Sequence, residues 1–149
     1  MNVLKARTVV LVVATLAFVA SAFAQPGYTE TQKRIQLLAV KNFRHSLQSD
    51  INGVVEGTLY DIVLYKKYYP GLDYNGIVDQ LNDLAVTSRV PQVRYKAHLA
   101  SMYFSGADRF NIVPAQDVWD QDSVFRQIAE QLEKDLLSSN LAGTTTSAK

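Results

Sequence analysis

The chain of 149 residues contains no cysteine, one tryptophan, two histidines and four prolines. Without cysteine it can form no disulfide, no thiolate metal site and no thiol nucleophile, so a folded domain must be held together by buried apolar surface. The charges are almost balanced, with 15 Lys and Arg against 14 Asp and Glu. Because nucleic-acid binding needs a strongly positive field, this balance favours neither a nucleic-acid partner nor a polybasic membrane-surface role.

The first 24 residues have the order of a secretory signal peptide. Lys5 and Arg7 supply positive charge, and an apolar run follows at residues 9–20. Ala22 and Ala24 then have the small-x-small spacing of a cleavage site. The run is shorter than the about 20 residues of a transmembrane helix. We therefore predict cleavage after Ala24, no stable membrane anchor, and export to the periplasm or the cell exterior.

Removing Lys5 and Arg7 from the 15 basic residues leaves 13, against 14 acidic ones, so the predicted mature chain has a net charge of −1. Apolar residues recur in it at helical spacing, and no stretch shows the period of two that is typical of a strand. The expected helices span residues 29–48, 54–69, 74–86, 91–105 and 122–137. The expected N-capping residues are Thr29, Asp73 and Asp122. The predicted fold class is therefore all-α.

We expect a single helical domain over residues 25–137. Its apolar stripes are predicted to face inward, from Ile35 and Leu38 in the first helix to Leu132 and Leu136 in the last. The end of the chain, residues 138–149, is rich in Ser, Thr, Ala and Gly, a composition that predicts a disordered tail.

A shift of 38 residues superimposes the apolar positions of two parts of the chain. The matched pairs include Phe43 with Leu81, Val55 with Val93, Leu59 with Ala97, and Ile62 with Ala100. One helical hairpin cannot cover its own apolar face, so stacked hairpins share a continuous core. This offset predicts two repeated helical hairpins.

The segment 91–100 resembles the second helix of a HEAT repeat, in which a Val-Arg pair near the helix start precedes small residues at the packing positions. The matching residues are Val93, Arg94, Ala97 and Ala100. The earlier unit departs from the pattern, because Glu56 stands where Arg is expected. The resemblance covers residues 37–105. It implies two HEAT-like hairpins, a capping fifth helix, and a role as a binding scaffold.

Tyrosines crowd the two predicted hairpins, with lysines among them. Tyr is an amphipathic anchor that is enriched at binding surfaces. We expect most of these tyrosines to pack between helices with their hydroxyls at the rim. The best candidates for an exposed binding surface are Tyr65, Lys66, Lys67 and Tyr68.

No spacing in the chain is typical of catalysis, of a metal site or of a cofactor site. His45 and His98 lie in different units and form no H-E-x-x-H motif. Asp79 and Asp83 stand one helical turn apart, as on a solvated helix face. We therefore expect no metal and no cofactor.

The sequence favours a non-catalytic exported module that binds a protein or peptide partner in the cell envelope. Two alternatives stay open. One is a structural envelope component that self-associates, and the acidic C-terminal part and basic middle of the chain are compatible with head-to-tail contact. The other is an envelope hydrolase whose pocket would gather Asp79, Asp83 or His98. Trp119, in the irregular segment before the last helix, is expected to plug the space between that helix and the hairpins.

Overall fold

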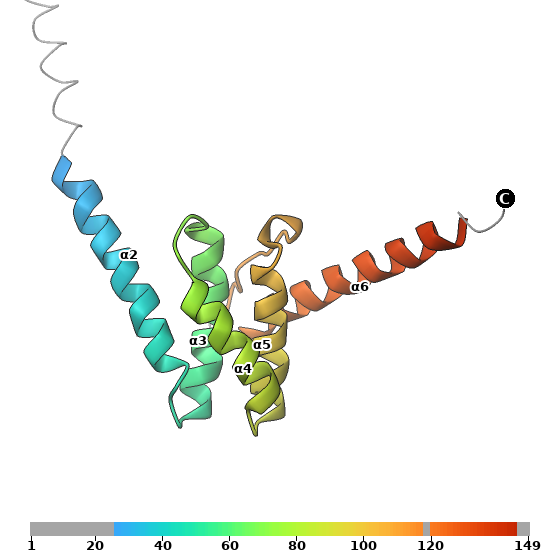
Figure 1. Ribbon diagram of the computed structural model, residues 1–149, viewed down its shortest axis with the longest axis horizontal. Helices are drawn as coiled ribbons and strands as arrows, with labels where there is room; N and C mark the ends of the chain where they lie inside the picture. Colours follow the sequence, from blue (N-terminus) through green and yellow to red (C-terminus); the bar gives the residue numbers. More distant parts are fainter. Residues whose placement is uncertain (1–25, 118–119, 146–149) are drawn as a thin grey trace, which may run out of the picture. The chain divides into compact units, whose positions relative to one another are not determined.

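The computed structural model describes residues 26–117 and 120–145, so the predicted signal peptide and Trp119 lie outside the described residues. Within these ranges the regular structure is entirely helical, and the all-α prediction is confirmed (Figure 1). The elements are α2 (Pro26–Ser46), α3 (Asn52–Tyr68), α4 (Asn75–Thr87), α5 (Pro91–Phe104), the short 3-10 helix η2 (Ala107–Arg109) and α6 (Asp122–Thr145).

The chain divides into two compact units within α2, between Leu37 and Leu38. In the first unit the described residues, 26–37, are the beginning of α2, and Ile35 and Leu37 are exposed there. The second unit holds the rest of α2 and all the other described elements. The core and the candidate sites described below belong to the second unit.

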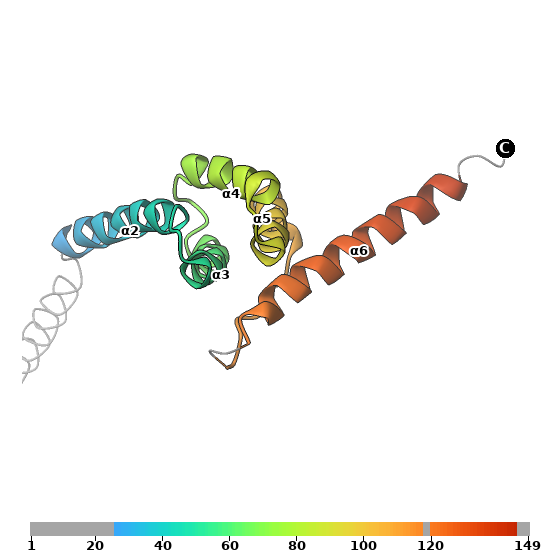
Figure 2. The ribbon, with the colours of Figure 1, turned by 90° about the horizontal axis from the view of Figure 1, so that it is seen from below.

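Helix α5 is the central element of the second unit. It packs against α3, α4 and α6, and Figure 2 shows it between α4 and α6. Its start is set by Pro91, which occupies the first helical turn, where a backbone N–H has no intrahelical partner. Ala97 and Ala100 are fully buried on this helix, and their small side chains let the neighbouring helices approach closely.

The core lies where α3, α4, α5 and the beginning of α6 meet. The largest fully buried side chains are Leu59, Ile62 and Val63 of α3, Ile77 and Leu81 of α4, Ile112, and Val124 and Ile128 of α6. Ile112 belongs to the segment between η2 and α6, so this irregular segment also contributes to the core. At about 25 cal/mol per Å² of apolar area, such burial stabilises a domain that has no disulfide.

The predicted inward stripes are wrong at both ends of the helical array. Ile35, Leu38 and Leu136 have exposed fractions of 60%, 57% and 65%. Helical spacing shows which residues share a face, but it does not show whether another element covers that face. In α2 the buried stripe consists of Val40 and Leu47 with half-buried Phe43 between them.

Two expected helix boundaries also differ from the structure. Helix α2 already begins at Pro26, so Thr29 lies inside the helix and is not its N-cap. Helix α6 continues to Thr145, so the tail predicted to be disordered from Ser138 is helical over its first residues. The Ser138 hydroxyl donates to the Lys134 carbonyl at 2.8 Å, a local bond that lets serine stay within a helix.

Neither of the two remaining expected caps is an N-cap in the structure. Tyr74 is the N-cap of α4. Asp73, the expected cap, lies one position before it, and its carboxylate accepts a hydrogen bond from the Asn75 N–H at 3.0 Å. Asp122 is the first residue of α6, where its negative charge suits the helix dipole, and its carboxylate binds Lys96.

Candidate functional site

The predicted binding surface on α3 is largely used by the fold itself. The Tyr65 ring is half-buried against Phe43 and Tyr69, at centroid distances of 5.2 and 4.6 Å. Burial, with the neighbouring Tyr69, raises the pKa of the Tyr65 phenol. The Lys66 ammonium donates to the Pro70 carbonyl at 3.0 Å and lies 5.0 Å from the centre of the Tyr74 ring.

Lys67 and Tyr68 complete this predicted surface. The Lys67 ammonium donates to the carbonyl of Ile112 and so ties the segment before α6 to α3. Tyr68 is 57% exposed. The expectation of exposure is therefore right for Tyr68. It is wrong for Tyr65, Lys66 and Lys67, which are half-buried because the Tyr65 ring packs against other rings and both lysines donate to backbone carbonyls.

Tyr74 shows how the other tyrosines are used. It is 4% exposed, and its hydroxyl lies 2.9 Å from the Tyr69 carbonyl and 3.2 Å from the Tyr65 carbonyl, either of which can accept its proton. Burial is the main cause that raises the pKa of this phenol, and the neighbouring tyrosines raise it further. Tyr74 thus closes the connection between α3 and α4.

The four residues that carry the HEAT resemblance all lie on α5. Val93, Ala97 and Ala100 are buried in the core. The Arg94 guanidinium is half-buried and donates to the Ser88 carbonyl at 2.8 Å, which binds the helix to the loop that precedes it.

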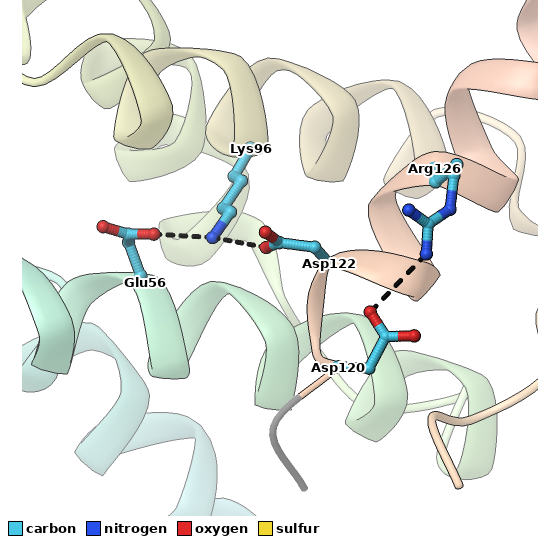
Figure 3. A network of polar contacts seen from close by, with 5 residues as sticks. All are labelled: Glu56, Lys96, Asp120, Asp122 and Arg126. Carbon is cyan, nitrogen blue, oxygen red and sulfur yellow. Dashed lines mark hydrogen bonds and ion pairs between the residues drawn. The ribbon is translucent and has the colours of Figure 1, made fainter. Parts of the chain in front are cut away.

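Two ion pairs that share Lys96 connect α3, α5 and α6 (Figure 3). The Lys96 ammonium, with a side chain only 13% exposed, lies 2.5 Å from a Glu56 carboxylate oxygen and 2.7 Å from one of Asp122. Burial by itself lowers the pKa of Lys96, but the hydrogen bonds to Asp122 and Glu56 and their charges outweigh it, so the pKa is raised. The sequence patterns did not predict these ion pairs. The one signal for them was Glu56, which stands where the HEAT pattern has Arg.

Beside these ion pairs, a groove of about 350 Å³ lies between α5 and α6. Phe125 and Ala129 give it an apolar lining, and Tyr95, which is 55% exposed, lies at its α5 side. Glu130 and Glu133 line it from α6. We call this feature the α5–α6 groove.

The charges that line the α5–α6 groove are unequally compensated. Lys96 has its two carboxylates, and Arg126 lies 3.5 Å from Asp120 (Figure 3). Glu130 and Glu133 are exposed and form no ion pair with any residue that the structure describes. The groove therefore combines an exposed aromatic ring with negative charge that is open to a ligand.

The residues considered for catalysis or metal binding are placed differently. Asp79, Asp83, His45 and His98 are all exposed, and none of them lines the α5–α6 groove. Over residues 26–117 and 120–145, no three His, Asp or Glu side chains come together as metal ligands.

None of the described helices has the length and apolarity that a membrane-spanning segment requires. No known protein family matches the chain, and no curated protein and no solved structure matches it significantly.

Proposed function

We propose that the chain is an exported, HEAT-like helical-repeat module of the cell envelope that binds a protein or peptide partner and catalyses no reaction. The observation that carries this proposal is the α5–α6 groove, which is apolar along its lining and negative at its edge. Binding sites of this kind combine an apolar contact area with a few polar groups that fix orientation.

The burial pattern supports the repeat part of the proposal. Positions that the 38-residue offset pairs are buried on both α3 and α5, as Val55 with Val93 and Leu59 with Ala97 show. Both helices therefore turn an equivalent face to the core. Helical repeats of this kind present faces that suit extended or helical partners.

The composition of the groove indicates the chemistry of the partner. Tyr95, which is 55% exposed, offers its ring to an apolar side chain or to the stem of Lys or Arg, while Phe125, only 2% exposed, forms the floor of the groove. Glu130 and Glu133 are three residues apart, so they lie on one side of α6 and can pair with two cations of a partner helix. We therefore expect a basic, amphipathic segment.

A photoreactive residue at Tyr95, crosslinked in cells and followed by mass spectrometry, tests the proposal. Tyr68 is the matched control, since it is exposed to a similar degree, 57% against 55%, and does not line the groove. We expect a discrete crosslinked product from position 95, lost when Glu130→Lys and Glu133→Lys are introduced. The same products from positions 95 and 68, or none from position 95, would contradict a binding role for the groove.

A further inference from the structure

The outer side of α2 has the opposite character to the α5–α6 groove. Leu38, Lys41 and His45 are exposed on the side of the helix that faces away from Phe43. Lys41, Arg44 and His45 also line a shallow hollow of about 430 Å³, to which no carboxylate contributes. We call the surface formed by Leu38, Lys41, Arg44 and His45 the basic face of α2.

The cations of this face are open to a partner. Lys41 and Arg44 are exposed and form no ion pair with a residue in the described ranges. The Arg44 guanidinium instead reaches over Gly76 at the start of α4, where a Cβ atom would lie 2.8 Å from its central carbon. Leu38, with 57% of its surface exposed, lies one turn before Lys41 on the same side of the helix.

The two features match in charge and in spacing. Lys41 and Arg44 are three residues apart, as are Glu130 and Glu133, so each pair spans about 4.5 Å along its helix axis. A helix laid along α6 can therefore form both ion pairs at once. Leu38, three positions before Lys41, lies toward the aromatic lining of the groove when the two helices run parallel, with Lys41 opposite Glu130.

We infer that the partner of the α5–α6 groove is α2 of a second copy of this chain. Lys41 and Arg44 of one copy pair with Glu130 and Glu133 of the next, and Leu38 packs against the groove lining. This inference rests on the proposed function, because it assigns an occupant to the same groove. The two surfaces differ, so the contact is head-to-tail, and repeated contacts build open chains unless the rotation closes a ring.

The test is the solution mass of the purified protein as a function of concentration, measured by sedimentation or light scattering. Two double variants reverse one surface each: Lys41→Glu with Arg44→Glu, and Glu130→Lys with Glu133→Lys. All four residues are exposed, so the fold is expected to persist, which circular dichroism checks. We expect the unmodified protein to grow in mass with concentration and each variant alone to remain a monomer.

Mixing the two variants is the decisive step. In the mixture the negative α2 of the first variant meets the positive α6 of the second. The unchanged α2 of the second variant meets the unchanged α6 of the first, so both contacts are again between opposite charges and assembly returns. The control is Asp79→Lys with Asp83→Lys, which changes the net charge as much as the α6 reversal does, at exposed positions on α4. This control is expected to assemble like the unmodified protein.

Three results would overturn the inference. They are a protein that stays monomeric at every concentration, assembly that persists in the α2 variant, and a mixture that does not reassemble. A monomeric protein whose position 95 still crosslinks to a different protein would retain the proposed function and reject the second copy as partner. The mass measurement and the crosslink therefore fail independently.

Discussion

Among single residues, Lys96 of α5 is the one whose ion pairs link three helices. Its ammonium is the shared partner of Glu56 and Asp122, whose side chains are 28% and 70% exposed. Glu56 depends most on this partner, because it is the less solvated carboxylate. Leaving a partly buried polar group unpaired costs more than an exposed ion pair contributes.

We expect Lys96→Ala to lower the free energy of unfolding by about 1–3 kcal/mol, since Glu56 loses its hydrogen-bonded cation. Lys134→Ala, at an exposed position of α6, is the control and should change stability by less than about 0.5 kcal/mol. Urea unfolding followed by circular dichroism measures both. Equal effects of the two substitutions would mean that the Lys96 pairs contribute nothing to stability.

Tyr74 predicts a loss of stability in alkali. Its pKa is raised in the folded protein, so above the ordinary tyrosine pKa of about 10 the unfolded chain binds fewer protons than the folded one. The stability that the neutral Tyr74 phenol contributes is therefore fully present below about pH 10 and declines as the pH rises above it. Tyr74→Phe removes the ionisable group, and its unfolding free energy should fall less steeply above pH 10 than that of the unmodified protein. Parallel pH profiles would contradict this role.

At the scale of the helix, α3 contains a position that is not optimised for stability. Gly57 lies inside the helix, and a Cβ atom built there meets nothing within 4 Å. Its φ is not positive, so alanine fits the native backbone. Glycine inside a helix costs about 1 kcal/mol relative to alanine.

Gly57→Ala should therefore raise the free energy of unfolding by about 1 kcal/mol. Gly76→Ala is the comparison, because its Cβ would meet Arg44 at 2.8 Å and this side chain must move. Thermal unfolding of both variants should show a higher midpoint for the Gly57 variant than for the Gly76 variant. The reverse order would show that the space beside Gly57 is filled in solution.

Sequence patterns predicted the helices α3, α4 and α5 within about two residues at each end, because dense apolar spacing and Pro70 and Pro91 define them. The outer helices were predicted less well, since local hydrogen bonds extend α6 beyond the residues that pack. The site was mostly missed. Lys66 and Lys67 bind backbone carbonyls, which have no sequence signature, and the groove depends on how α5 and α6 cross.

At the scale of the whole molecule, a nearly neutral chain holds surfaces of opposite sign. The net charge is +1, yet the basic face of α2 and the acidic side of the α5–α6 groove are each uncompensated within the described residues. The net charge alone therefore does not reveal these local concentrations of charge.

The proposed head-to-tail assembly should weaken as salt is added, because the screening length falls from about 10 Å at 0.1 M to about 3 Å at 1 M. The apolar contact of Leu38 is not screened, so some association should survive at high salt. Solution mass measured across this range checks the prediction. Assembly that strengthens steadily with salt would indicate a contact dominated by apolar surface instead.

The central position of α5 has a consequence for biosynthesis. Helices α3 and α4 come earlier in the chain, yet both pack against a helix that is synthesised after them. Until residues 91–104 have left the ribosome, Leu59, Ile62 and Leu81 lack the surface that buries them. The nascent chain therefore cannot complete this core before residues 91–104 emerge, and until then these apolar side chains are accessible to chaperones.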